Sequence, residues 1–240
     1  AVAIVLAATF VSGQVRADNG STFPSTFLTP TMSISRSSSL TPSMARSMVA
    51  AATSVGAVGH VVSFPVVSLT GQRRNDDDVL RLTNGWRIPM ATMVAPVAYI
   101  SAIGGQEMAN AAADGYVLMG ETSAEVRSAQ VGDVLTLRDS RFRPKLFTVG
   151  AIVPDRFVDW GDFYMTDTTA RVLGSMKISR VAVTGMSSAT SVIAAWKAKR
   201  FPIGSKFRLR TSWDRVNPDG TLGTATTKKL LGELIYKPTT

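Results

Sequence analysis

The chain has 240 residues, of which 45% are hydrophobic and 18% are charged, and its formal net charge is +9. This composition is typical of a globular protein, and the length allows one large domain or two small ones with a substantial core. The sequence holds no cysteine and one histidine, His60, which excludes disulfides, thiolate nucleophiles, cysteine-based metal centres and zinc sites with several histidine ligands.

The positive charge is concentrated at the end of the chain, because residues 176–240 contain 12 basic and 3 acidic residues. The aromatic-interleaved and Gly-rich basic motifs of RNA-binding proteins are missing, so no specific nucleic acid partner is predicted. An anionic cell-wall polymer, an anionic membrane surface or an acidic protein partner would suit this charge. A solvated surface without a ligand would suit it as well.

Residues 1–20 are predicted to be a signal-like or anchoring segment. Ala1–Val11 is an apolar run of eleven residues, which is too short for a bilayer-spanning helix but right for the core of a signal peptide. We expect cleavage after Ala17 and an exported protein of the cell envelope or the extracellular space. If the run were retained, it would bring the chain close to a membrane or pack inside an assembly.

Residues 21–42 are predicted to be a linker. Thirteen of the residues between Ser21 and Ser43 are Ser or Thr, and this stretch contains no acidic residue. A segment of this kind cannot bury enough apolar surface to fold alone. The same composition is typical of a chloroplast transit peptide, so a plastid location is the alternative.

Residues 43–200 are predicted to form an α+β core, with mixed strands in a small twisted sheet or partial barrel and with short helices. Helices are expected near residues 43–53, 106–113, 121–129, 168–173 (capped by Asp167) and 189–200. Residues 58–69 are expected to be a strand pair or one long strand bent at Pro65. Further strands are expected near 86–99, at 116–119, as a hairpin of 134–138 and 146–153, and at 163–165 and 178–183.

An acidic segment at residues 155–162 is predicted to be an exposed loop. Asp155, Asp159, Trp160 and Asp162 are candidates for an interaction surface. These carboxylates are also where an acid–base pair would have to lie, as in a glycosidase, because the chain offers no cysteine and His60 is expected to be a packed or rim residue. No catalytic residue, cofactor or metal ligand is predicted.

Residues 201–240 are predicted to form a basic β extension. Lys206, Arg208 and Arg210 would share one face of a strand and Phe207 and Leu209 the other, because side chains alternate along a strand. A second short strand is expected at residues 230–236, after a turn at 217–220. The basic face is a second candidate interaction surface.

Residues 97–200 resemble the extracytoplasmic domain of MacB/FtsX-type transporter permeases. The resemblance lies in Gly-x-Val-Leu-x-Gly from Gly115, Val-Gly-Asp-x-Leu-x-Leu from Val131 and Phe-Thr-Val-x-x-Ile-Val-Pro-Asp from Phe147. It continues in Phe-Tyr-Met-Thr-Asp from Phe163 and Ser-Arg-Val-Ala-Val from Ser179. It implies an α+β module outside the cytoplasm and carries no catalytic signature.

The end of the chain is similar to the segment that precedes the catalytic domain in some actinobacterial VanY-like cell-wall peptidases. The similarity lies in Phe-Pro-Ile-Gly-Ser from Phe201 with Arg-Leu-Arg from Arg208, and in Lys-Leu-Leu-Gly-Glu-Leu from Lys229. In those proteins a MacB-like module comes first. The zinc-binding His/Asp motif of that family has no counterpart in this sequence, so the similarity implies the accessory module and not the peptidase activity.

These observations predict a non-catalytic exported module that mediates contact with a protein or with the cell envelope, as part of a complex. The alternative is a structural or linker subunit of a large assembly, with the plastid as one location. A carboxylate-based hydrolase is the third hypothesis.

Overall fold

The computed structural model describes residues 23–24, 27–29, 31–73, 80–82, 87–113, 115–201, 207–212, 215–216 and 222–223. Its larger sheet contains β1 (Thr31–Leu40), β2 (Val58–Ser63), β3 (Val66–Arg73), β4 (Leu80–Leu82), β5 (Ile88–Ala95), β6 (Tyr116–Gly120), β7 (Val134–Arg138), β8 (Pro144–Val153), β9 (Phe163–Thr166), β10 (Ile178–Thr184) and β11 (Phe207–Ser212). The helices are α2 (Pro42–Thr53), α3 (Val97–Ala111), α4 (Glu121–Arg127), α5 (Asp167–Ala170) and α6 (Ala189–Ala198), with 3₁₀ turns η1 (Asp155–Val158) and η2 (Arg171–Leu173). A separate pair of short strands is formed by β12 (Arg215–Val216) and β13 (Leu222–Gly223).

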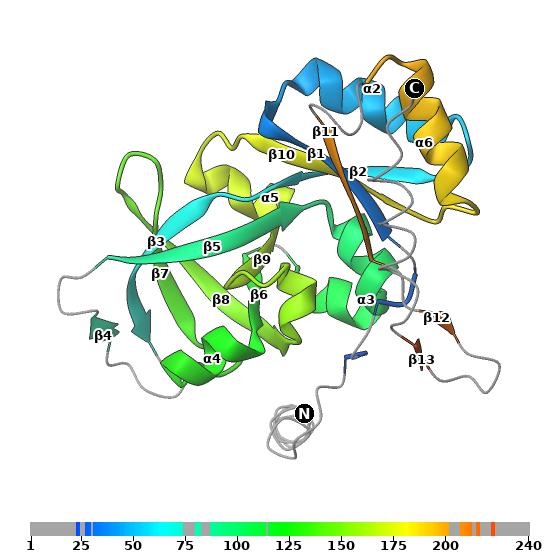
Figure 1. Ribbon diagram of the computed structural model, residues 1–240. Coiled ribbons are helices and arrows are strands. Elements are labelled where there is room, and N and C mark those ends of the chain that lie inside the picture. Colours follow the sequence, from blue (N-terminus) through cyan, green and yellow to red (C-terminus); the bar gives the residue numbers. More distant parts are fainter. Residues whose placement is uncertain are drawn as a thin grey trace, which may run out of the picture.

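Six strands of the larger sheet close into a barrel. The strand order is β11-β1-β10-β2-β5-β9-β6-β8-β7-β3-β4, and β3 also pairs with β5. The strands from β5 to β3 therefore form a ring (Figure 1), in which β5–β9 and β6–β8 are parallel and the other pairs are antiparallel. The predicted α+β class, with mixed strands in a sheet or partial barrel, is confirmed.

Alternation along each barrel strand separates two hydrophobic clusters. In β9, Phe163 and Met165 belong to the cluster inside the barrel, whereas Tyr164 belongs to a cluster on the outside. In β6, Val117 and Met119 lie inside and Leu118 lies outside. Strands that are buried on both faces read as continuous apolar runs, which is why the sequence in this region is so hydrophobic.

Helix α3 covers the outer face of the barrel and also the underside of β2 and β10. Its buried residues share one cluster with Val62 and Ala182 from those two strands. The helix is kinked at Gly105, where φ is +88°, a conformation that glycine adopts without steric cost. The predicted strand near 86–99 and helix at 106–113 are corrected here: β5 ends at Ala95, and the helix already begins at Val97. An apolar run of this length does not distinguish a strand from a buried helix by periodicity alone.

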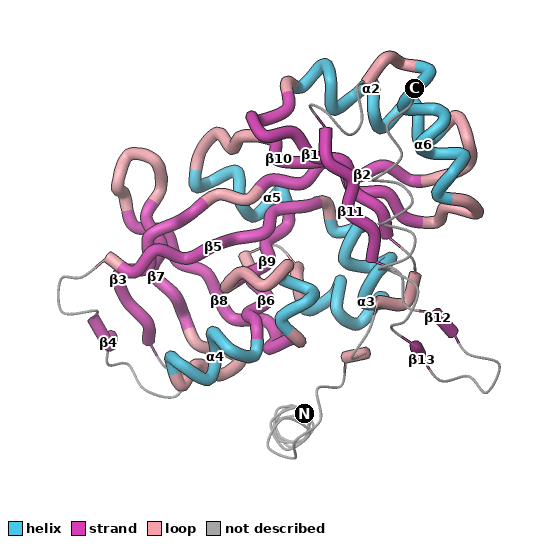
Figure 2. The backbone as a smooth tube through the Cα atoms, in the orientation of Figure 1, coloured by secondary structure: helices cyan, strands magenta, loops and turns pink. Residues whose placement is uncertain are grey.

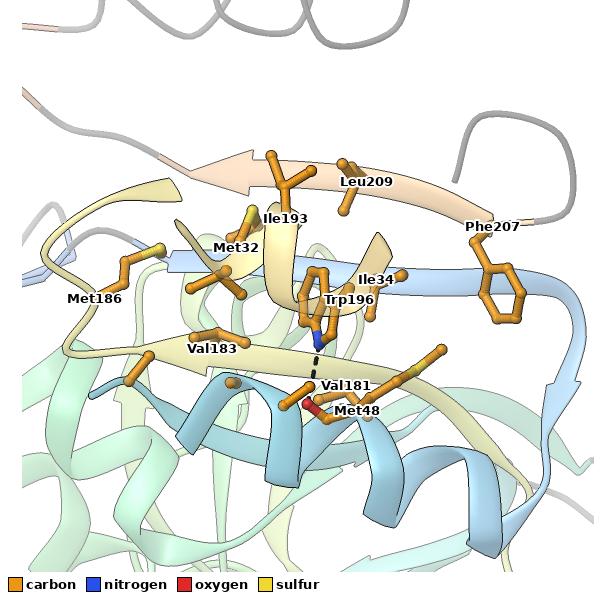
Figure 3. Packing of buried hydrophobic residues seen from close by; sticks show 14 of the residues in the cluster. Met32, Ile34, Met48, Val181, Val183, Met186, Ile193, Trp196, Phe207 and Leu209 are labelled. Carbon is orange, nitrogen blue, oxygen red and sulfur yellow. Dashed lines mark hydrogen bonds between the residues drawn. The ribbon is translucent and has the colours of Figure 1, made fainter. Parts of the chain in front are cut away.

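The strands β11, β1, β10 and β2 extend beyond the barrel as a layer covered by α2 and α6 (Figure 2). Trp196 of α6 is fully buried between the helices and the sheet, and its Nε1 donates a hydrogen bond to the carbonyl oxygen of Met48 at 2.9 Å (Figure 3). Met32 and Ile34 of β1 and Leu209 of β11 surround this tryptophan in the same cluster.

This layer corrects the predicted boundaries at both ends of the core. Residues 31–40 fall in the range that we predicted to be a linker, but they form β1, which lies between β10 and β11. Strand β11 falls in the predicted extension, yet it buries Phe207 and Leu209 in the same cluster as β1. The Ser/Thr-rich composition concealed a strand whose few apolar residues, among them Met32 and Ile34, are placed by the sheet in the core.

The remaining predicted elements agree with the structure to different degrees. The hairpin of β7 and β8 and the strands β6, β9 and β10 form close to their expected bounds. The helix expected at 168–173 is a four-residue α5 followed by η2, and its cap is Thr166, whose side chain accepts a hydrogen bond from the backbone N–H of Thr169, rather than Asp167. The strand expected at 230–236 lies outside the described residues. No helix in the described part of the chain is long and apolar enough to cross a membrane.

Candidate functional site: an acidic turn that presents Trp160

Residues 155–162, here called the acidic turn, join β8 to β9. The first half is the 3₁₀ turn η1 and not a loop, because Phe157 and Val158 point into the core and are fully buried. Asp159 and Trp160 then both have left-handed backbone conformations, with φ of +54° and +60°. Two consecutive non-glycine residues in this conformation are uncommon and persist only where the surrounding contacts hold them.

Backbone hydrogen bonds close the turn on itself. The N–H of Trp160 donates to the carbonyl oxygen of Asp155 at 2.9 Å, and that of Gly161 donates to the carbonyl oxygen of Val158 at 3.0 Å. A Cβ atom at Gly161 would lie 2.8 Å from the carbonyl oxygen of Ala91, so this position has no room for a larger residue. The turn is therefore packed tightly against β5.

Asp155 binds the start of helix α4. Its Oδ1 accepts a hydrogen bond from the backbone N–H of Thr122 at 3.1 Å, and its Oδ2 accepts one from the Thr122 hydroxyl at 2.5 Å. Gly120, just before this helix, would place a Cβ atom 2.6 Å from the same Oδ1. A glycine at this position thus permits the close approach of the carboxylate.

Asp162 joins the turn to β5 and α4 together. One carboxylate oxygen accepts the backbone N–H of Ala91 at 2.6 Å, and the other accepts the Ser123 hydroxyl at 2.6 Å. The guanidinium of Arg127 lies 3.6 Å from the second oxygen. Asp162 therefore has a partner on each neighbouring element.

Asp159 pairs with Arg180 of β10. The two side chains approach to 3.1 Å, with 9% of the arginine side chain and 27% of the aspartate side chain exposed. The Arg180 guanidinium also lies over the Phe64 ring, 4.5 Å from its centroid. This pair connects the turn to the layer outside the barrel, because Arg180 belongs to β10 of that layer.

The result of these contacts is a rigid turn with one large apolar side chain outside. Trp160 is 79% exposed. The three aspartates of the same turn are instead bound to neighbouring elements of the fold. The predicted set of Asp155, Asp159, Trp160 and Asp162 is thus brought together in one turn, but with distinct roles. The carboxylates hold the turn, and the indole is presented to solvent.

Each of the three carboxylates of the acidic turn accepts hydrogen bonds from protein donors, which occupy carboxylate oxygens. In the described residues, no group of three or more His, Asp or Glu side chains is close enough to hold a metal ion.

His60 is a packed residue, as predicted. It is 3% exposed, and its Nε2 lies 2.8 Å from the Thr184 hydroxyl. Burial lowers the pKa of His60 from 6.5 to about 4, so the imidazole is neutral near pH 7.

The basic strand is described in part. Lys206 lies outside the described residues, and the backbones of Arg208 and Arg210 pair with Ser35 and Ser33 of β1. Phe207 and Leu209 are buried, so the predicted apolar face of this strand is confirmed. The basic face stays a prediction.

Sequence reasoning missed the residues that hold the turn, namely Thr122, Ser123, Arg127 and Arg180. All four lie far from the turn in sequence and look like ordinary polar residues of a helix or strand. The closest signal was Gly120 before Glu121–Arg127, because a glycine directly before a helix indicates a close approach. Nothing in the sequence identified which carboxylate makes that approach.

No family model matches this sequence. No curated protein matches it either. Among solved structures, the chain is similar to the periplasmic region of MacB from Actinobacillus actinomycetemcomitans, with 12% sequence identity and a TM-score of 0.45 over 77% of this chain and 89% of that chain. It is also similar to a domain of a proposed permease protein from Porphyromonas gingivalis, with 13% identity and a TM-score of 0.39 over 80% of this chain and 91% of that chain.

Proposed function

We propose that this chain is a non-catalytic module of the cell envelope that binds a protein partner through Trp160, as part of a complex. The observation that carries the proposal is the exposure of this tryptophan on a turn that three carboxylates hold rigid. The envelope location is the part of the proposal that depends on the signal-like sequence of residues 1–20.

The energetics of interfaces favour this role for Trp160. Tryptophan is enriched among the residues that carry most of the binding energy in protein interfaces. Binding is weakened by the entropy lost when a mobile side chain or loop becomes ordered, and a turn that is already fixed reduces this loss. The partner would offer an apolar pocket for the indole with polar groups at its rim.

The carboxylates support a structural role over a catalytic one. Asp155, Asp159 and Asp162 are each bound by donors of the protein itself, so an acid–base mechanism would have to break contacts that hold the turn. The alternative is a structural subunit in a large assembly, which would use the same surface. The two proposals differ in the interface, which would be permanent in the assembly and would dissociate for the module.

A site-specific photo-crosslinking experiment tests the proposal. The full chain is expressed in its native host with a benzophenone amino acid in place of Trp160, and a matched chain carries it in place of Val126, which is 76% exposed on α4. A discrete protein adduct from position 160, lost when unmodified wild-type chain is added in excess, is the expected result. Adducts of the same pattern from both positions, or none from position 160, would overturn the proposal.

A further inference from the structure

Two irregularities of strand pairing meet on β10, between Ile178 and Arg180. Along β1, Ser35 pairs with Arg180 and Leu40 pairs with Ile178, so five steps of β1 match two steps of β10 and residues 36–39 form a bulge relative to β10. Along β2, Val62 pairs with Arg180 and Ser63 with Ile178, which leaves Ser179 without an opposite residue. Bulges of this kind often redirect side chains next to binding sites.

The two bulges enclose an open cavity of about 460 Å³, here called the bulge recess. Its polar lining includes Arg36, Ser38, Ser39, Lys177 and Ser179, and the ring of Phe64 forms an apolar wall. The Ser179 hydroxyl accepts a hydrogen bond from the Phe64 backbone N–H at 3.1 Å, which fixes this wall against β10. A volume of this size falls within the range of small-molecule sites in proteins and exceeds the size of a bare inorganic anion.

The charged side chains that line the bulge recess are cationic. Arg36 and Lys177 both line it, and no carboxylate does in the part of the chain that the structure describes. Among the described residues, neither cation takes part in an ion pair, whereas Arg127, Arg143, Arg171 and Arg180 each have an aspartate partner. Two unpaired cations with several hydroxyl donors around one cavity are suited to an anion with several acceptor oxygens.

We propose that the bulge recess binds a phosphoryl group carried on a small hydroxylated organic molecule, such as a glycerol phosphate unit. Arg36 and Lys177 contact the phosphoryl oxygens, the serine hydroxyls donate hydrogen bonds to them, and Phe64 packs against the carbon chain. This site does not involve Trp160, so its failure and that of the proposed partner contact are independent.

Isothermal titration of the full chain with three probes tests the proposal. Glycerol 3-phosphate is expected to bind more tightly than inorganic phosphate, and glycerol is expected not to bind. The Arg36→Ala and Lys177→Ala variants should each weaken binding about tenfold, the effect of losing one charge-assisted hydrogen bond of about 1.4 kcal/mol. Lys197→Ala, which removes an exposed charge from α6, is the control and should leave the affinity unchanged.

A variant that fills the cavity without changing its charge separates a built site from a generally basic surface. Ser38→Trp should abolish glycerol 3-phosphate binding while the melting curve stays that of the wild-type chain. The proposal is overturned if no probe binds at millimolar concentration, if Lys197→Ala weakens binding as much as Lys177→Ala, or if a folded Ser38→Trp chain binds normally. Unchanged affinity in folded Arg36→Ala and Lys177→Ala chains would overturn it as well.

Discussion

The acidic turn and the bulge recess are both next to Phe64, through Arg180 and through the cavity lining, and they use their charges in opposite ways. At the turn, the Arg180 guanidinium is nearly buried and meets Asp159 at 3.1 Å. In the recess, Arg36 and Lys177 line an open cavity that has no carboxylate from the described residues in its lining. A buried charge without a partner costs several kcal/mol, whereas an exposed one does not. The fold therefore requires the partner of Arg180, whereas it requires none for Arg36 and Lys177, which stay accessible to a ligand.

Loss of the buried pair should have the largest effect on stability. Asp159→Ala leaves the Arg180 guanidinium without its carboxylate and places alanine in a left-handed conformation, so the free energy of unfolding should fall by about 3 kcal/mol. Urea unfolding followed by circular dichroism measures this change.

A matched control comes from an exposed pair. Asp167 lies 3.7 Å from Arg171, and both side chains are at least half exposed. Asp167→Ala should cost less than about 1 kcal/mol, because solvent screens such pairs.

In the Asp159→Ala background, Arg180→Met should be far less destabilising than in the wild-type chain. Strictly additive effects of the two substitutions would show that the pair does not couple the turn to β10.

His60 is another buried ionisable group, on β2 beside the strand that carries Arg180, and it is neutral near pH 7. Because its folded pKa is about 4 and its ordinary pKa is 6.5, the unfolded chain binds more protons between these values. The contribution of His60 to stability should therefore be constant above pH 6.5. It should fall as the pH drops toward 4, by on the order of 3 kcal/mol. Urea unfolding at a series of pH values tests this expectation.

The His60→Gln variant is the control, because its amide can still bond to the Thr184 hydroxyl but does not titrate. Its stability should depend less on pH than that of the wild-type chain between pH 6.5 and 4. Identical pH profiles for the two chains would mean that other groups cause the dependence.

The smallest effect on stability is expected in the bulge recess. The Arg36→Ala/Lys177→Ala double variant removes two cations that have no ion-pair partner among the described residues, so the free energy of unfolding should change by less than about 0.5 kcal/mol. Thermal unfolding in phosphate-free buffer measures this. A loss of more than about 1.5 kcal/mol would show that the cations are part of the fold, and the contrast with Arg180 would fail.

Local sequence pattern predicted the elements whose signal is contained in neighbouring residues. The hairpin of β7 and β8 follows from an alternating run and a strongly apolar run separated by a basic turn, and α6 follows from its amphipathic spacing. The same reasoning identified the acidic turn as a unit, because Asp155, Asp159, Trp160 and Asp162 are close in sequence. It also placed His60 among packed residues.

Only the tertiary structure decided the rest, because burial and pairing depend on residues that are distant in the chain. Residues 31–40 are Ser/Thr-rich and read as a linker, yet β10 and β11 on either side make them a strand of the core. The carboxylates of the acidic turn read as a solvated cluster, yet Thr122, Ser123 and Arg180 bind them and leave Trp160 as the exposed group. The sequence by itself determined the α+β composition and the positions of the turns, and long-range contacts decided which side chains those turns bury or present.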